Sequence, residues 1–484
     1  MQLALPPERD PAIAVAAQRR GPPPGQGAAH RSVRPAQGHA PRSSTIREWE
    51  ILRESKLLAT LARPVPQALE GPHEPQMSAE PAEGRAGLCA RLAEIAYHHP
   101  HRIAFVDPAA KAEWTGRGAI TWTYAAAAEI VARLANGLRG WRLPPGSRIG
   151  LCLDGGAEGL IAYLAVEAAG HVPCPLPIAW DEARLAAAVQ SAGLSAVLTQ
   201  ARFGASLPAE RLCRVALSYF GLRYVAAFGP AVPDGVISLD GMVLDERGGP
   251  FAPQTGGGLV SFAAGDPARP MHRPAASLLA AIAHCRARIR VGPGERILML
   301  LPGGDLRSLV AGLGTALLAG ASLEILPVFE AAAFAVALAR PVPTHLVLPA
   351  QLEANLARIA LPGTLRSVTL AHRAPAAFGP ALLHPTAERV IVDLVDLDAT
   401  AILVGARGAD DVARTLADPN SAALPPIRMA MRIEPDGRLA LRGEACAAHP
   451  LRRGMQAETT ADGWTLTRFR TEVRDGLATA VALA

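Results

Sequence analysis

The hydrophobic positions from residue 84 onward alternate between two spacings, which predicts strands alternating with helices. Short apolar runs typical of strands lie at 119–124 (AITWTY), 147–153 (SRIGLCL) and 196–199. Segments with helical spacing separate them, at 125–140, 158–169 and from Asp181 onward. Alternating strands and helices of this length indicate parallel βαβ units, so we predict an α/β protein with doubly wound sheets.

Composition along the chain predicts five parts. Residues 1–44 are rich in Pro, Gly, Ala and Arg, and we predict a disordered tail because such a segment buries too little apolar surface to fold. Residues 45–83 combine a helix at 45–61 with a Pro-rich linker. The remaining parts are a first α/β subdomain at 84–255, a second at 256–405 and a β-rich closing subdomain at 406–484.

Two segments bear on where the protein resides, the arginine-rich start and one long apolar run. The start leaves three interpretations open for residues 1–44, namely a true tail, an organellar transit peptide or a mis-assigned start. No apolar segment of a secretory signal follows it. The run at 308–323 is ended by Glu324 and is too short for a membrane span, so it predicts a buried glycine-containing helix. We expect a cytoplasmic protein.

Charge and metal-ligand spacing exclude several classes of function. The net charge of +5 is small for 484 residues and lies mostly in the tail, so nucleic-acid binding is not expected. The six cysteines show no CxxC spacing, which argues for reduced thiols and against a disulfide framework or a zinc site. His98, His99 and His101 flank Pro100 without a second ligand cluster, which indicates a solvated helix end.

The segment 259–280 (LVSFAAGDPARPMHRPAASLLA) is the candidate anion site. It begins as a strand, turns through Gly265 and Pro270 and runs into a helix, the layout of a phosphate-cradling loop. Such loops need hydroxyl donors and usually a lysine. Here Asp266 adds a negative charge, and no lysine follows Lys111 because only Lys56 and Lys111 are lysines among 48 basic residues.

The order of these pieces resembles the adenylate-forming superfamily, which includes acyl- and aryl-CoA ligases, peptide-synthetase adenylation domains and luciferases. The clearest likeness is 120–177, where a strand with TY and a helix precede a second helix that ends in AG and a Pro-rich turn. Later pieces agree, among them LVAGLGTALLAGASLEIL, THLVLPAQLEANL and EPDGRLALRGEA. The likeness runs from residue 84 to the last residue. It implies two doubly wound α/β subdomains plus a small β-barrel-like C-terminal region.

The resemblance also implies a phosphate loop of the form T-S-G-T-T-G-x-P-K-G, and its counterpart here is degenerate. Hydroxyl positions are taken by Ala263, Ala264, Asp266 and Pro267, and the second glycine by Ala268. The degenerate positions that we single out as the binding site are Gly265, Asp266, Arg269, Pro270 and Met271, the last in place of the lysine. Arg269 or Arg273 is the candidate for replacing the lost positive charge.

Two further motifs of the family are altered. Where its YG-x-TE motif contacts adenine and Mg²⁺, the segment 390–402 offers Asp393, Asp396 and Asp398, read either as oxygen ligands for a metal or as a strand edge with one solvated face. Where its TGD motif holds the ribose, Thr467 is followed by Arg468 and Phe469. Asp475 comes too late and is predicted to lie in a hairpin turn.

These losses lead to two hypotheses about function. Members of the family use Mg·ATP to form an acyl-adenylate and then pass the acyl group to CoA or a carrier thiol, with a lysine on a C-terminal lid that is expected beyond Ala484. The first hypothesis is a pseudoenzyme with no catalytic residues, metal or cofactor, which binds an acyl or aryl carboxylate, an acyl carrier or an active synthetase. The alternative is a divergent ligase that uses a lid supplied by another chain.

Overall fold

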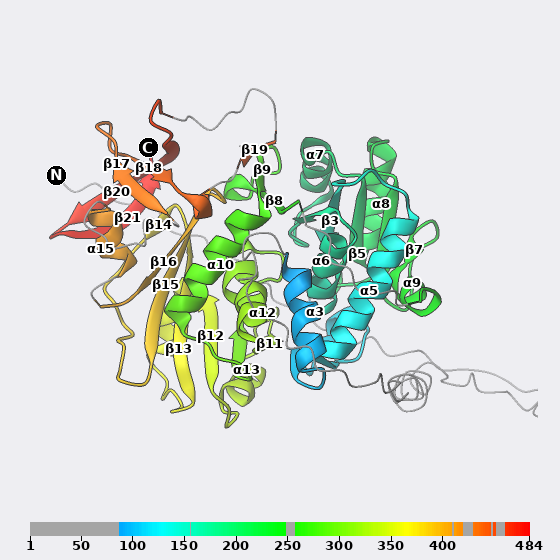
Figure 1. Ribbon diagram of the computed structural model, residues 1–484, viewed down its shortest axis with the longest axis horizontal. Coiled ribbons are helices and arrows are strands. Elements are labelled where there is room, and N and C mark those ends of the chain that lie inside the picture. Colours follow the sequence, from blue (N-terminus) through cyan, green and yellow to red (C-terminus); the bar gives the residue numbers. More distant parts are fainter. Residues whose placement is uncertain are drawn as a thin grey trace, which may run out of the picture. The chain divides into compact units, whose positions relative to one another are not determined.

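The computed structural model describes residues 87–154, 156–247, 257–408, 411–419, 429–446, 449–451 and 460–484. The predicted tail at 1–44 and the helix and linker at 45–83 lie outside the described residues. The described part forms three larger sheets, one small sheet and the helices that cover them (Figure 1).

A five-stranded sheet with the order β4-β3-β5-β6-β7 follows the predicted βαβ pattern, because all its neighbouring strands are parallel. Its strands are β3 (Arg148–Cys152), β4 (Val172–Pro175), β5 (Ala196–Gln200), β6 (Tyr224–Phe228) and β7 (Ile237–Ser238). The accompanying helices are α3 (Leu88–His98), α4 (Lys111–Thr115), α5 (Tyr124–Gly140), α6 (Glu158–Ala168), α7 (Glu182–Ala192), α8 (Pro208–Ser218) and α9 (Leu239–Asp245).

An eight-stranded sheet has the order β16-β15-β13-β12-β10-β11-β1-β2. Its strands are β1 (Ile103–Val106), β2 (Thr121–Thr123), β10 (Arg296–Met299), β11 (Ser322–Ile325), β12 (Thr344–Pro349), β13 (Leu365–Arg373), β15 (Val390–Leu397) and β16 (Ala401–Ala406). Strand β1 pairs with β11, with Phe105 opposite Leu323. The predicted first subdomain therefore does not keep all its strands in one sheet, since periodicity identifies a strand but not its distant partner.

Helices from both halves share one hydrophobic core with these sheets. The second half contributes α10 (Ala275–Ile289), α11 (Leu306–Ser308), η3 (Leu309–Gly314), α12 (Thr315–Ala319), α13 (Ala331–Leu338), η4 (Ala350–Leu352), α14 (Glu353–Leu356) and α15 (Val412–Ala417). The predicted buried helix corresponds to α11, η3 and α12, where an added Cβ on Gly314 would meet Ile282 Cδ1 at 2.3 Å. None of the helices within the described ranges is both long and apolar enough to cross a membrane.

The C-terminal part is a five-stranded antiparallel sheet with the order β14-β21-β20-β18-β17. Its strands are β14 (Ala376–Ala377), β17 (Ala430–Ile433), β18 (Arg438–Arg442), β20 (Thr465–Arg474) and β21 (Leu477–Leu483). Its outer strands β14 and β17 do not pair with each other among the described residues, so this part is an open sheet and not barrel-like. The predicted turn at Asp475 is confirmed: Asp475 and Gly476 have φ of 51° and 73° between paired strands, the backbone of a tight hairpin.

Candidate functional site

The candidate phosphate loop connects two strands of a small sheet. Strand β8 (Leu259–Phe262) leads through η2 (Ala263–Gly265) to β9 (Pro270–Arg273), and α10 begins only at Ala275. The predicted strand, turn and helix are present, but a short strand that was not predicted stands between the turn and the helix, because residues 270–273 pair with β8 and with β19 (His449–Pro450). A strand, and not a helix, directly follows the loop, so no helix N-terminus adds N–H groups there. An anion at this loop would have to bind the backbone amides of the loop itself.

Four of these N–H groups already donate to acceptors within the loop. The amide of Ala263 donates to Arg269 O at 3.0 Å, and that of Asp266 donates to Ala263 O at 2.9 Å. The amide of Arg269 donates to Asp266 O at 3.0 Å. The Ala268 amide donates to the carboxylate Oδ1 of Asp266 at 2.9 Å. The side chain of Asp266 thus takes, on one loop amide, the place that a bound anion would take.

Helix α7 holds the loop from outside. The guanidinium of Arg184 donates to Gly265 O at 2.8 Å, and the hydroxyl of Ser191 donates to Pro267 O at 2.5 Å. Gly265 has a positive φ of 66° and no neighbour within 4 Å of an added Cβ, so glycine serves the turn and not a close approach. Both tethers end on backbone carbonyls, so they fix the shape of the loop and add no donor to it.

The side chains of Met271 and Arg273 are buried. Met271, at the position of the family's lysine, is 6% exposed and packs against Ala263. Arg273 is 1% exposed and donates to the carbonyls of Ala399 at 2.7 Å and Ala445 at 2.8 Å, which joins β9 to the β15–β16 turn and to η5 (Glu444–Cys446). Burial lowers the pKa of Arg273. This guanidinium is a structural clamp and not a replacement for the lost lysine.

Arg269 turns toward Asp398. Its Nη1 lies 3.5 Å from Asp398 Oδ2, and Arg468 Nε of β20 lies 2.8 Å from the same oxygen. Asp398 and Ala399 have φ of 57° and 58° and lie in the three-residue turn, 398–400, that connects β15 to β16. Arg468 occupies the middle position of the altered TGD motif, whereas the following Phe469 is fully buried. The loop, this turn and the C-terminal sheet therefore meet at one carboxylate.

A second charged group lies after the carboxyl ends of β10, β13 and β15, the edge where doubly wound sheets bind ligands. Asp305 Oδ2 lies 2.6 Å from Arg307 Nη2 and 2.8 Å from Arg373 Nη2. Burial opposes ionisation of Asp305, but the hydrogen bond and charge of Arg307 bring its pKa below the usual value. Burial, with the charge of Asp305, raises the pKa of Asp396, which lies 3.7 Å from Arg373.

A third group surrounds Asp393. His372 Nε2 lies 3.0 Å from Asp393 Oδ1, and Arg407 bridges Asp393 at 2.8 Å and Glu353 at 2.5 Å. Burial again works against the charge, yet the hydrogen bonds from His372 and Arg407 lower the pKa of Asp393. Arg407 likewise lowers the pKa of Glu353 against the effect of burial.

Neither prediction for the three aspartates of 390–402 describes them. Asp393, Asp396 and Asp398 are buried rather than solvated, because β15 lies between β13 and β16 and arginines from distant segments neutralise them. Within the part of the chain that the structure describes, no three His, Cys, Asp or Glu side chains are placed to hold a metal ion. The exposed His98, His99 and His101 at the end of α3 confirm the predicted solvated helix end.

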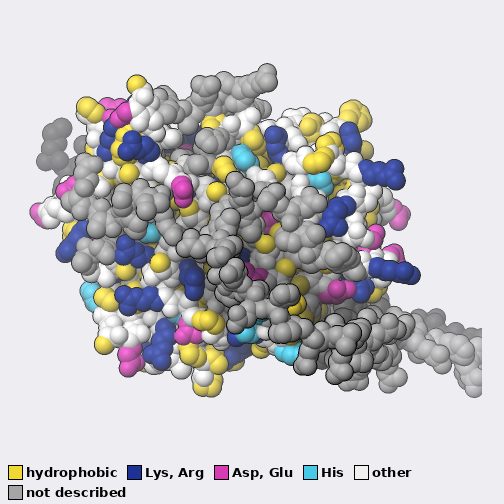
Figure 2. Space-filling model, in the orientation of Figure 1, with side chains coloured by type: hydrophobic (Ala, Val, Ile, Leu, Met, Phe, Trp, Pro, Cys, Tyr) yellow, Lys and Arg dark blue, Asp and Glu magenta, His cyan; other side chains and the backbone are white. Residues whose placement is uncertain are grey.

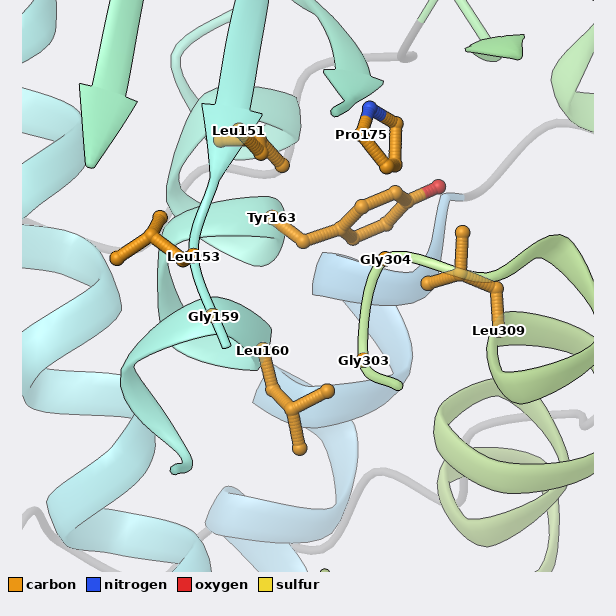
Figure 3. Close-up of a pocket in the computed structure, with 9 residues that line it drawn as sticks. All are labelled: Leu151, Leu153, Gly159, Leu160, Tyr163, Pro175, Gly303, Gly304 and Leu309. Carbon is orange, nitrogen blue, oxygen red and sulfur yellow. The ribbon is translucent and has the colours of Figure 1, made fainter. Parts of the chain in front are cut away.

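A small apolar cavity lies beside the carboxyl ends of β3 and β10. Figure 3 shows Tyr163 of α6 pointing between Pro175 and the Gly303–Gly304 segment, with Leu309 on the far side. Its free volume is about 10 Å³, which is room for one water molecule. The buried Tyr163 hydroxyl has no hydrogen-bond partner among the described residues. The other lining residues are Leu151, Leu153, Gly159 and Leu160.

Lys111, the one lysine within the described ranges, is fully buried. Its ammonium lies 2.6 Å from Asp107 Oδ2 and 2.6 Å from Glu158 Oε1. Burial and the charge of Glu158 raise the pKa of Asp107, whereas Lys111 and Arg117 outweigh burial and lower the pKa of Glu158. The Lys111 ammonium therefore forms structural ion pairs. No motif or residue spacing in the sequence indicates that Asp107 and Glu158 would be its partners.

Part of the chain is similar in sequence to known proteins. Residues 92–223 match the family model "AMP-binding enzyme". Chondramide synthase cmdD of Chondromyces crocatus is 36% identical over 128 residues, which are 26% of this chain and 3% of that protein. A component of the linear gramicidin synthase of Brevibacillus parabrevis is 32% identical over 143 residues, 30% of this chain and 2% of that protein. The chain thus spans only a few hundredths of the length of these relatives.

Solved structures with the same fold cover more of the chain. A benzoate CoA ligase from Burkholderia xenovorans LB400 has a TM-score of 0.64 at 18% identity, covering 82% of this chain and 79% of that one. The apo structure of Mycobacterium smegmatis MbtA has a TM-score of 0.62 at 18% identity, covering 83% and 76%. The inhibitor-bound N-terminal domain of FACL13 from Mycobacterium tuberculosis has a TM-score of 0.63 at 15% identity, covering 82% and 99%.

Proposed function

We propose that this chain, which carries an AMP-binding enzyme domain on the fold of the adenylate-forming synthetases, has lost ATP-dependent carboxylate activation and acts as a binding protein. The expected ligand is an acyl or aryl carboxylate, and the expected protein partner is an acyl carrier or an active synthetase. The synthetases among its relatives and the apolar cavity at Tyr163 support this direction.

The observation that carries the proposal is the contact between the Asp266 carboxylate and the Ala268 amide. A triphosphate at this loop would meet a negative charge at the amide that should bind it. Two like charges about 4 Å apart repel by roughly 1 kcal/mol in water and roughly 4 kcal/mol at an effective dielectric of 20. The amides of Ala263, Asp266 and Arg269 have internal acceptors, so the repulsion is not offset by new hydrogen bonds from them.

The distribution of cations supports the same conclusion. Transfer of an adenylyl group develops negative charge, which such enzymes stabilise with positioned cations and hydrogen-bond donors. Near the loop, Arg273 donates to backbone carbonyls and Arg269 faces Asp398. Arg307 and Arg373 face Asp305. These arginines already serve acceptors of the chain, and a nucleotide would have to compete for them.

The cavity at Tyr163 bears on the choice between an acyl ligand and a protein partner. Its walls are apolar and its one buried hydroxyl can donate to a carbonyl or carboxylate oxygen, which suits an acyl or aryl group. With a volume of about 10 Å³, it accepts such a group only if the Gly303–Gly304 segment moves. The acyl-binding form of the proposal therefore requires this movement, whereas the protein-partner form does not use the cavity.

The alternative function, a divergent ligase completed by a separate lid, draws support from the charged groups at the carboxyl ends of β10, β13 and β15. Ligands of doubly wound sheets bind at this edge. Asp305, Arg373 and Asp396 are placed there, and a ligand that displaced one ion pair would find charges of both signs.

Acid-dependent exchange of pyrophosphate into ATP separates the two functions. We expect no exchange above background with a panel of aliphatic, aromatic and amino acids, with an active benzoate-CoA ligase and benzoate as the positive control. Exchange that scales with protein and stops when Mg²⁺ is removed would contradict the proposal and favour the alternative. Thermal-shift measurements with the same acids then test the acyl-binding form separately.

A further inference from the structure

Helix α13 carries apolar side chains on two opposite faces. Phe334, Ala337 and Leu338 pack against the outer face of the eight-stranded sheet. On the solvent side, Ala332, Ala335, Val336 and Ala339 are exposed. Their spacing of i, i+3, i+4 and i+7 is that of a helix stripe made to pack against a neighbour. The residues 331–339 contain no polar side chain at all.

Exposed apolar residues also flank α13 along the chain on both sides. Phe329 is 56% exposed and Val336 67%, and Val328 and Val342 are also exposed. Figure 2 shows hydrophobic side chains gathered at the lower edge of this face, where Figure 1 places α13. Single exposed apolar residues are ordinary, whereas a contiguous group marks an interaction surface. The α13 patch comprises Val328, Phe329, Ala332, Ala335, Val336, Ala339 and Val342.

We propose that the α13 patch binds a second copy of this chain, with the two α13 helices antiparallel about a two-fold axis. The argument rests on the two charges that bracket the patch, Glu330 before the helix and Arg340 after it. In an antiparallel pair, Glu330 of each copy lies level with Arg340 of the other. The surface is thus complementary to itself, as a two-fold interface requires.

The geometry of the helix suits this pairing. About ten residues separate Glu330 from Arg340, which is about 15 Å along a helix axis. Three of the four stripe residues are alanines, so two helix axes can approach to about 8 Å. Arg340 donates to Glu324 of its own chain through Nη1 at 2.8 Å, and a guanidinium keeps other N–H donors for a second carboxylate. Glu330 is exposed at the start of the helix.

A lipid surface is the weaker occupant for the α13 patch. Helices that lie in a membrane interface carry Lys or Arg along a polar face, whereas residues 327–343 contain Arg340 as their one base and Glu330 as their one acid. One acid at the start of the helix and one base after its end favour a partner that presents a base opposite Glu330 and an acid opposite Arg340.

Sedimentation of the full chain over a concentration series tests the proposal. The wild type is expected to shift from monomer to dimer mass, and Val336→Glu to remain monomeric with an unchanged melting temperature. Leu217→Glu on α8, at a side chain that is 80% exposed, is the matched control and should dimerise like the wild type. A wild type that is monomeric at every concentration, or dimers lost in Leu217→Glu and kept in Val336→Glu, would overturn the proposal.

Charge reversal tests the antiparallel arrangement itself. Glu330→Arg and Arg340→Glu each place like charges opposite one another twice, so each should weaken self-association about tenfold or more. A mixture of the two variants restores both opposite-charge pairs and should form a heterodimer at wild-type concentrations. If the mixture associates no better than either variant alone, the two charges do not meet and the arrangement is wrong.

Discussion

Asp266 contributes both its side chain and its backbone to the hydrogen bonds of the candidate phosphate loop. Its carboxylate accepts the Ala268 amide and its backbone joins two further hydrogen bonds in the loop. The charge of Asp266 and its place in the motif single it out in the sequence. The sequence does not identify the amide that the carboxylate engages, since that depends on the turn at Gly265.

Replacing Asp266 with threonine should remove the repulsion without unfolding the loop. The residue is half-buried and a hydroxyl can still accept from the Ala268 amide, so we expect the unfolding free energy to change by less than about 1 kcal/mol. Binding of Mg·ATP, measured by calorimetry, should become detectable. Asp436→Thr is the control, because Asp436 makes the same kind of contact, with the Arg438 amide at 3.0 Å, away from the loop. An equal gain in both variants would show that Asp266 is not the block.

The burial of Met271 makes it difficult to introduce a lysine at this position. Its side chain is 6% exposed against Ala263, so a lysine at this position would begin in an apolar environment. Restoring the family's cation therefore requires more than one substitution on β9.

Arg407 is the residue whose loss should show the strongest pH dependence. It forms ion pairs with Asp393 and Glu353 and lowers the pKa of both carboxyl groups in the folded protein. These ion pairs therefore stabilise the fold fully at pH values above the pKa values of the unfolded chain. The stabilisation is lost as the pH falls through the lower pKa values of the folded protein. Arg407→Met leaves two carboxylates without their shared cation and should cost about 3–5 kcal/mol at pH 7. The difference from wild type should shrink toward about pH 4, where protonation relieves the unpaired charges.

Urea unfolding at several pH values measures this effect. The control is Arg91→Met, which breaks an exposed pair with Glu94 at 2.8 Å and should cost less than about 1 kcal/mol at any pH. A loss in Arg407→Met that stays constant with pH would mean that lost packing, and not unpaired charge, explains the destabilisation.

At the level of elements, local periodicity predicted the helices well and the strands unevenly. The apolar spacing at 125–140 predicted α5 to within one residue. Strand β9 is not predicted because its four residues, PMHR, follow a proline-containing turn. They are too few to show the alternation of apolar and polar residues that indicates a strand. Its identity comes from pairing with β8 and β19, and pairing is not encoded in a four-residue window.

Two helical glycines allow the effect of side-chain packing on stability to be measured separately from the effect of helix propensity. Gly314 has no room for a side chain, because an added Cβ would meet Ile282 at 2.3 Å, whereas Gly140 in α5 has nothing within 4 Å. We expect Gly314→Ala to cost about 1–3 kcal/mol through overpacking. Gly140→Ala should be neutral or stabilise by up to about 1 kcal/mol. Chemical denaturation of both variants is the measurement, and a stable Gly314→Ala would contradict the tight contact.

For the whole molecule, composition and element order were enough to predict an α/β fold with the likeness to adenylate-forming enzymes. They were not enough to predict that β1 and β2 join the eight-stranded sheet, since β11, the partner of β1, lies about two hundred residues further along the chain. The same limit applies to the site. Asp393, Asp396 and Asp398 could be singled out from the sequence, but Arg373, Arg407 and Arg468 reach them from other segments.

The folded chain is expected not to bind nucleotide at the candidate phosphate loop. Calorimetric titration of the full wild-type chain with Mg·ATP measures this binding. We predict no saturable heat, because the amides of Ala263, Asp266, Ala268 and Arg269 have internal acceptors and the Asp266 carboxylate repels the phosphates. Saturable binding of Mg·ATP by the wild type would show that the loop accepts a nucleotide despite Asp266.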